Sequence, residues 1–172
     1  MEIEIGSGDG SFLIAAARRA PATNFLGIER SPAKFRRLAA RVAQLDPRRI
    51  RILRADACCV LHTIVPVASV SAYHVYFPDP WPKRRHARRR LFTRALVAVL
   101  GDGLMPGGSL FTATDVEAYA QRIRAVVLAD RRFEERACGV DHPGLATAFA
   151  RKYRAAGRMI YPAVFVRRTE LA

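Results

Sequence analysis

Hydrophobic and polar positions alternate along this chain with two different periods. Short runs rich in β-branched and aromatic residues predict strands, whereas stretches with apolar residues three and four positions apart predict amphipathic helices. Strands are predicted at residues 2–6, 24–29, 50–56, 71–77, 108–114, 132–138 and 159–167. Helices are predicted at residues 10–19, 32–45, 57–64, 87–100 and 116–129. A longer segment, residues 139–158, separates the last two strands and departs from this alternation.

The order of these elements predicts the fold class. Strands that alternate with helices form parallel βαβ units, so we expect an α/β protein with a doubly wound, mostly parallel seven-stranded sheet and helices on both faces. The first strand of such a sheet is central, and we expect it to be paired on both sides. At 172 residues and 51% hydrophobic content, the chain is predicted to form one domain, residues 1–172.

Polar residues cluster where the predicted strands end. In open parallel sheets, ligands bind at the carboxyl ends of the strands, near the point where the strand order reverses. The residues that follow the first five strands are the glycine-rich turn at 6–10, then Glu29, Asp56, Asp79 and Asp115. One acid at each successive strand end predicts a binding site along this edge.

The turn EIGSGDG indicates a nucleotide-type ligand. Gly6 and Gly8 let the backbone turn tightly and approach a ligand closely, although a glycine-rich turn alone is a weak signal. Ser11 stands where the dinucleotide fingerprint has Gly or Ala, so the spacing favours the GxGxG turn of S-adenosylmethionine enzymes. Glu29 is placed to accept hydrogen bonds from a ribose diol.

Two further positions complete this predicted nucleotide site. Asp56 can accept from an adenine amino group, and Ala57 leaves room for the ring. Glu4 lies within a central strand, where a carboxylate is costly unless it is paired. A ligand ammonium group would pair it, and a local salt bridge or a helix N-cap partner is the alternative.

Composition narrows the class of partner. Lys and Arg number 29 against 15 Asp and Glu, which gives a net charge of +14 and makes a nucleic acid or another anionic surface the expected partner. No apolar run is long enough to span a membrane and no secretory signal is evident, so a cytoplasmic protein without a membrane partner is expected. Cys58, Cys59 and Cys138 fit neither a zinc site nor a disulfide framework, and we expect them to be mostly buried. No metal is predicted.

Residues 77–92, FPDPWPKRRHARRRLF, combine a rigid acid with a basic run. Pro78 and Pro80 restrict the backbone around Asp79. The cations that follow suit phosphate binding, although a solvated helix face would have the same composition. Trp81 could stack on a base, but core packing is the more common role of tryptophan.

Together with the glycine turn, these motifs resemble the tRNA (guanine-N7)-methyltransferase family over nearly the whole chain. The matching pieces are EIGSGDG, NFLGIE, RADA, FPDPWPKRRHARRRLF, GGSLFTATDVEAYA and TAFARKYR. The resemblance implies a Rossmann-like methyltransferase fold, S-adenosylmethionine as cofactor and tRNA as partner. It also implies methylation of guanine N7 in the tRNA variable loop by a monomer or weak homodimer.

The resemblance assigns roles to individual residues of this chain. It implies a cofactor site formed by Glu4, Gly6, Gly8, Glu29, Asp56, Ala57 and Asp79, with Asp79 also catalytic. It implies substrate contacts from Lys83, Asp115, Thr147, Phe149 and Ala150. It implies RNA contacts from Arg84, Arg85, His86, Arg88, Arg89 and Arg90.

The sequence departs from the family pattern at several positions. The family turn reads T-x-F/Y-E, and Ala150 replaces its acid, so one expected carboxylate contact to guanine is missing. Ala87 and Val116 replace a histidine and an aromatic residue. A basic segment and a helix that precede the first strand in relatives are not part of this sequence, so the domain is expected without that extension.

The predicted reaction needs alignment rather than a general base, because guanine N7 already has an exposed lone pair. Methylation makes the purine cationic, so a carboxylate that accepts hydrogen bonds from its N1–H and amino groups stabilises the transition state more than the substrate. Asp79 and Asp115 are the candidates. Two alternatives stay open: methylation of an exocyclic amine, and a tRNA-binding relic with weakened catalysis. A nicotinamide-dependent oxidoreductase ranks last, because of Ser11 and the basic run.

Overall fold

The sheet and its helices follow the predicted order. The computed structural model describes residues 1–139 and 141–169, apart from the side chains of Arg84 and Ala87. The strands are β1 (Glu2–Ile5), β2 (Phe25–Ile28), β3 (Ile50–Leu53), β4 (Val70–Tyr76), β5 (Leu104–Thr114), β6 (Phe133–Arg136) and β7 (Tyr161–Arg167). The helices are α1 (Ser11–Arg19), α2 (Pro32–Val42), α3 (Ala57–Thr63), α4 (Arg94–Gly103), α5 (Glu117–Leu128) and α6 (Ala148–Ala155). Two 3-10 turns, η1 (Arg84–Arg89) and η2 (Pro143–Ala146), lie before α4 and α6.

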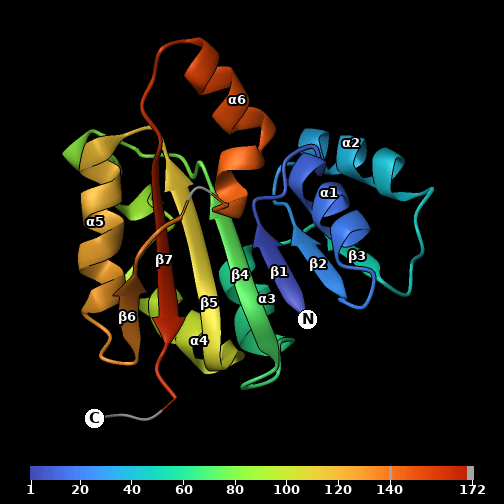
Figure 1. Cartoon of the computed structure of the whole chain (residues 1–172), viewed down its shortest axis with the longest axis horizontal. Coiled ribbons are helices and arrows are strands. Elements are labelled where there is room, and N and C mark those ends of the chain that lie inside the picture. Colours follow the sequence, from blue (N-terminus) through green and yellow to red (C-terminus); the bar gives the residue numbers. More distant parts are fainter. Residues whose placement is uncertain (140, 170–172) are drawn as a thin grey trace.

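The strands form one seven-stranded sheet in the order β3-β2-β1-β4-β5-β7-β6 (Figure 1). Parallel pairing joins β3 through β5, and β7 pairs antiparallel with both β5 and β6. The predicted central position of β1 is confirmed, since it pairs with β2 on one side and β4 on the other. The strand order reverses between β1 and β4, so their carboxyl ends mark the expected position of a ligand.

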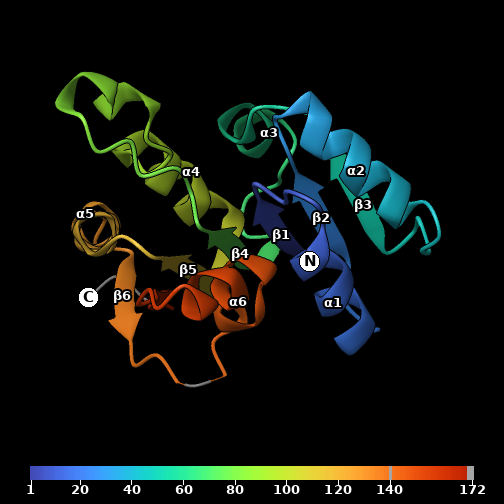
Figure 2. The ribbon, with the colours of Figure 1, turned by 90° about the horizontal axis from the view of Figure 1, so that it is seen from above.

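Two hydrophobic clusters cover the two faces of the sheet. The larger one packs α3, α4 and α5 against the central strands and includes the fully buried Phe92, Leu96 and Leu100. The smaller one packs α1 and α2 around Leu13 and Leu38. Figure 2 shows α4 and α1 on opposite sides of the sheet. Burial of one such aliphatic or aromatic side chain contributes about 1.5–3 kcal/mol, so these clusters hold the strand ends in place.

The element boundaries correct two expectations. The helix predicted at 87–100 begins only at Arg94, because the Thr93 side chain accepts a hydrogen bond from the Leu96 amide at 3.2 Å and caps it there. The preceding basic run forms the separate turn η1. Strand β5 begins at Leu104, four residues earlier than predicted, because α4 runs directly into it.

The segment between β6 and β7 folds over the sheet. It contains η2 and α6, and α6 lies above the carboxyl ends of the central strands (Figures 1 and 2). Every helix in residues 1–139 and 141–169 is too short or too polar to span a bilayer. In the same described part of the chain, no cluster of three or more His, Cys, Asp or Glu residues could hold a metal ion.

Candidate methyl-transfer site

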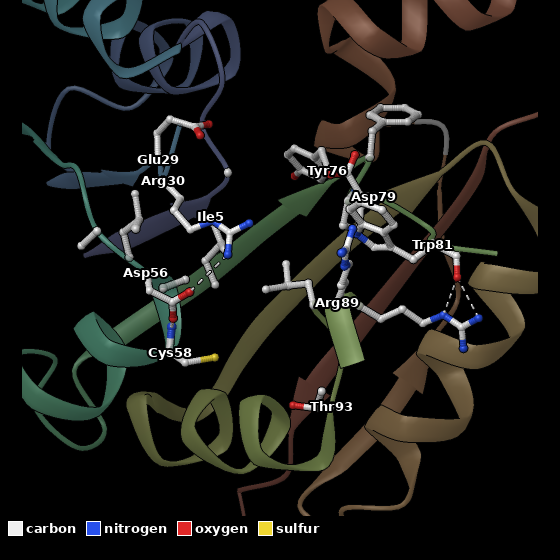
Figure 3. Close-up of a pocket in the computed structure, with 18 of the residues that line it drawn as sticks. Ile5, Glu29, Arg30, Asp56, Cys58, Tyr76, Asp79, Trp81, Arg89 and Thr93 are labelled. Carbon is white, nitrogen blue, oxygen red and sulfur yellow. Dashed lines mark hydrogen bonds and ion pairs between the residues drawn. The ribbon is translucent and has the colours of Figure 1, made fainter. Parts of the chain in front are cut away.

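A pocket of about 750 Å³ opens at the carboxyl edge of the sheet. The ends of β1, β2 and β3 form one wall, and the loop after β4 together with η1 forms the other. Figure 3 shows Glu29, Arg30 and Asp56 on the first side and Asp79, Trp81 and Arg89 on the second. This volume lies within the usual range for small-molecule sites, so the pocket is large enough for a nucleoside-sized ligand.

The glycine turn and Glu29 form one hydrogen-bonded unit. The Glu29 carboxylate accepts from the Gly8 amide at 2.9 Å and from the Ser31 amide at 2.7 Å. Gly6 and Gly8 adopt positive φ angles of 78° and 57°, which only glycine adopts without strain. A Cβ at Gly6 would meet nothing within 4 Å, so this backbone borders open space.

Asp56 and Ala57 lie together where β3 leads into α3. The Asp56 carboxylate accepts from the Cys58 amide at 3.0 Å, so it caps α3. Its other oxygen lies 3.9 Å from the Arg30 guanidinium, and the side chain remains about half exposed. Both Asp56 and Ala57 line the pocket. The acid predicted to meet a ligand is therefore also a helix cap.

The cysteines are not buried as predicted. Cys58, Cys59 and Cys138 are all exposed, because α3 begins at the edge of the sheet and residues 137–139 lie outside the regular elements. Cys58 lines the pocket, and partial burial followed by the charge of Asp56 raises the pKa of its thiol. The thiolate form is disfavoured there.

Glu4 is buried but does not line the pocket. Its Oε2 atom has no hydrogen-bond partner among the described residues, and burial raises its carboxyl pKa to about 8. No salt bridge to Glu4 is found in the described part of the chain, so that alternative does not explain it. Hydrogen bonds from the Ser7 side chain and from the Leu13 backbone, in the first turn of α1, lower its pKa against the larger effect of burial, so the N-cap alternative stays open. Contact with a ligand ammonium group stays a prediction.

The loop after β4 is held by an arginine. Phe77 and Trp81, two residues either side of Asp79, both adopt positive φ angles, 51° and 43°. Such conformations cost non-glycine residues about 1–3 kcal/mol and occur where surrounding contacts enforce them. Arg90 supplies contacts here: its guanidinium donates to the Trp81 carbonyl at 2.9 and 3.1 Å and to the Pro80 carbonyl at 3.2 Å. Asp79 is thus carried into the pocket wall by a clamped loop.

Trp81 belongs to the pocket and not to the core. It lines the pocket wall and is part of neither hydrophobic cluster in the described residues, so the core-packing interpretation was wrong. The Arg89 guanidinium lies 4.9 Å from its ring centroid, and the His86 ring meets it edge-on at 5.4 Å. The rigid prolines around it leave the indole at the surface of the loop.

The predicted RNA contacts lie on this same wall. Arg88, Arg89 and Arg90 line the pocket, and Arg85 is exposed on η1. Lys83, which was predicted to contact the substrate, is exposed just before η1. The predicted contact from the Arg84 side chain falls outside the described part of the structure. Because the Arg90 donors hold the loop, its main interaction in this structure is internal.

Two sets of predicted substrate residues lie at different ends of α6: residues 147–150 are at its start, and Asp115 pairs with Arg158, which follows its end. Thr147 is buried and caps α6 by accepting from the Ala150 amide at 3.1 Å. Ala150 is fully buried, whereas Phe149 is 45% exposed. Asp115 is mostly buried, and its carboxylate lies 2.6 Å from Arg158. Neither Asp115 nor the turn at 147–150 lines the main pocket.

Sequence reasoning missed several residues of this site. Arg30 and Lys34 line the pocket on the same side as Glu29 and Asp56, and Arg158 pairs with Asp115. Arg30 directly follows Glu29, and this adjacency could have indicated it. Arg158 lies 43 positions beyond Asp115 in a chain rich in arginine, so nothing in the sequence singled it out.

Known proteins resemble this chain in sequence. A family model described as "Putative methyltransferase" matches residues 1–163. A protein of Treponema pallidum (strain Nichols) named tRNA (guanine-N(7)-)-methyltransferase is 36% identical over 165 residues, covering 96% of this chain and 66% of the relative. A protein of the same name from Nocardia farcinica is 41% identical over 128 residues, covering 74% of this chain and 48% of the relative. The chain therefore spans about half to two thirds of the length of these relatives.

Solved structures resemble it in fold. The 16S rRNA methyltransferase KamB superposes with a TM-score of 0.68 at 15% identity, covering 97% of this chain and 87% of that one. The [4+2]-cyclase SpnF superposes with a TM-score of 0.67 at 14% identity, covering 98% and 74%. At such identities the likeness concerns the fold alone. It agrees with the predicted Rossmann-like sheet.

The family is established by sequence. The matched model covers nearly the whole chain, including the glycine turn, the clamped loop and the segment that carries α6. The resemblance to tRNA (guanine-N7)-methyltransferases that the motifs predict is confirmed by the relatives. This chain belongs to that methyltransferase family.

Proposed function

We propose that this chain methylates N7 of a guanine in the tRNA variable loop, with S-adenosylmethionine as the methyl donor. The observation that carries the proposal is the placement of Asp79. A clamped, conformationally strained loop holds this acid in the wall of the same pocket that Glu29 and Asp56 line from the opposite side. The names of the relatives agree with this activity.

The residues of the first wall fit S-adenosylmethionine. Open space over Gly6 leaves room for a ligand against the backbone, and the Glu29 carboxylate has acceptor capacity beyond its two amide hydrogen bonds. Asp56 and Ala57 border the same space, where an adenine ring needs an acceptor and a small neighbour. When bound, this donor supplies an electrophilic methyl group: the N7 lone pair forms the new N–C bond while the C–S electron pair leaves with sulfur.

The protein's contribution is orientation and charge. Asp79 accepts hydrogen bonds from the N–H groups of the guanine edge, which become stronger donors as the purine becomes cationic. Trp81 and the aliphatic pocket wall exclude water from the reacting atoms. The basic residues of η1 hold the phosphates around the target base. The same proposal includes a single domain, a cytoplasmic location, and action as a monomer or weak homodimer.

The deciding experiment incubates the purified protein with S-adenosylmethionine and unmodified tRNA, then measures 7-methylguanosine in digested RNA by mass spectrometry. We expect the product with the unaltered chain and a loss of at least about 100-fold in kcat for Asp79→Asn, because the amide removes the charge that stabilises the transition state. Asp46→Asn, at an exposed turn before β3, is the matched control and should keep full activity.

Two outcomes would contradict the proposal. Tight tRNA binding without product would favour a binding protein with no catalysis. A methylated exocyclic amine in place of 7-methylguanosine would assign a different reaction to the same pocket.

A further inference from the structure

Three aromatic side chains meet beside the pocket. Phe77 begins the clamped loop, and Phe149 and Tyr153 lie one turn apart on α6, so both project from the same helix face. The Phe77 ring centroid lies 5.9 Å from that of Phe149 and 5.3 Å from that of Tyr153. Phe149 and Tyr153 are stacked, 6.1 Å apart with planes 29° from parallel.

This aromatic trio is open to solvent at Phe149. Phe149 is 45% exposed, which is unusual for a phenylalanine that already has two aromatic neighbours. Tyr153 and Phe77 are half-buried. Because Phe77 lines the pocket, the trio continues the pocket wall outward onto α6.

The charge around the trio is positive. Helix α6 carries Arg151, Lys152 and Arg154 and no acid. The Arg158 guanidinium, which pairs with the Asp115 carboxylate, lies 4.8 Å from the centroid of the Tyr153 ring. An exposed aromatic face within a positive surface matches the sites at which proteins stack unpaired nucleobases and hold the adjacent phosphates.

We infer that the trio binds an unstacked base of the RNA substrate, the nucleotide next to the methylated guanine. The inference rests on the proposed function, since a guanine buried in the pocket must leave its own stack and separate from its neighbour. Phe149 provides the open face for that neighbour, and Tyr153 and Phe77 fix the Phe149 ring. Base stacking is tolerant of sequence, so the site would select an unpaired nucleotide and not a particular base.

The test combines a protein change with an RNA change. Dissociation constants are measured for the unaltered protein and Phe149→Ala, each with intact tRNA and with tRNA lacking the base 5′ or 3′ of the methylated guanine. We expect Phe149→Ala to weaken binding of intact tRNA about 5- to 150-fold, the range for loss of one stacked base. Removal of one of the two neighbouring bases should weaken tRNA binding by the unaltered protein by a similar factor. The same removal should weaken tRNA binding by Phe149→Ala less than about twofold.

Controls separate stacking from folding. Phe149→Tyr keeps the ring and should bind intact tRNA within about twofold of the unaltered protein. Phe149→Ala should bind S-adenosylmethionine normally and keep the same circular dichroism spectrum, because the side chain is exposed and lies outside the pocket lining.

The inference is overturned if each base removal lowers the tRNA affinity of Phe149→Ala by the same factor as that of the unaltered protein, because the two effects would then be independent. It is also overturned if Phe149→Ala binds intact tRNA normally. The two proposals can fail separately. If the unaltered protein forms no 7-methylguanosine, the proposed function fails, and this binding cycle can still be measured with the same RNAs.

Discussion

At the scale of single residues, Glu4 is a buried acid whose burial disfavours its ionised form. Its carboxyl is buried in a central strand, and its Oε2 atom has no partner among the described residues. Burial raises its pKa to about 8, so the folded protein keeps the proton that the unfolded chain loses near pH 4.5. The folded state therefore binds more protons between these values, and stability falls as the pH rises through them.

This imbalance predicts a pH dependence of stability. As the pH rises from 5 to 8, the raised pKa of Glu4 should lower the free energy of unfolding by up to ~4 kcal/mol. Glu4→Gln keeps the side-chain shape but cannot ionise, so it should flatten this profile and stabilise the protein at pH 8. Thermal unfolding across this pH range measures the effect, with the exposed Glu117→Gln as control. Parallel profiles for Glu4→Gln and the unaltered protein would contradict the explanation.

Single residues also show what sequence could and could not predict. Glu29, Asp56 and Asp79 were placed correctly in one pocket, because parallel strands bring their carboxyl ends to a common edge. The predictions of a buried Cys58 and a core-packed Trp81 are wrong, because the average burial of a residue type does not depend on whether its position borders a pocket. The Arg158–Asp115 contact depends on how an irregular segment folds back, which periodicity does not encode.

At the scale of elements, Arg158 adds to the contacts of Phe77 with Phe149 and Tyr153 that hold α6 over the sheet. The guanidinium joins the end of β5 to the residues after α6, with one contact to the Asp115 carboxylate and one to the Tyr153 ring. Ala150, which replaces the acid of the family turn, is fully buried at the start of the same helix. Arg158 is therefore the charged contact that orients Asp115 in this chain.

We expect Arg158→Ala to lower kcat for 7-methylguanosine formation about tenfold and to lower Tm by about 2–4 °C, as loss of about 1 kcal/mol would. Arg158→Lys restores the charge without the planar stacking, so it should recover part of kcat. Arg122→Ala, an exposed arginine on α5, controls for the loss of one positive charge. Equal kcat in Arg158→Ala and the unaltered protein would show that Arg158 does not orient Asp115 for catalysis.

Two arginines in and after η1 are expected to have different roles: one holds the loop that carries Asp79, and the other contacts RNA phosphates. Arg90 clamps the loop that carries Asp79, whereas Arg85 is exposed on the turn. We expect Arg85→Ala to weaken tRNA binding and to reduce the slope of log K against log salt by about 0.9. Arg90→Ala should instead lower kcat and leave this slope nearly unchanged. Binding measured from 50 to 300 mM salt, with kcat for each variant, distinguishes them; a shallower slope for Arg90→Ala would assign it to phosphate contact.

At the scale of the whole molecule, the mostly parallel sheet with a central first strand was predicted from the sequence, whereas the boundaries of the basic segment were not. Alternating periods imply parallel βαβ units, but the position of the antiparallel β7 between β5 and β6 does not follow from such units. The run RRHARRRLF is compatible with one continuous helix, so only the Thr93 cap and the Arg90 clamp, which depend on tertiary contacts, divide it.

The strand order also constrains the time at which the molecule can be completed during synthesis. Strand β6 pairs only with β7 among the described strands, and β7 lies between β6 and β5 although it comes last of the seven. When β6 has left the ribosome it can pack against α5 but has no strand to pair with, and the α6 segment that follows it is not yet held in place by β7. The pocket walls from β1 to β4 can assemble earlier, but the aromatic trio acquires its fixed position only when β7 closes the sheet. A nascent chain would thus complete the pocket walls, including η1, before it could fix the aromatic trio in place.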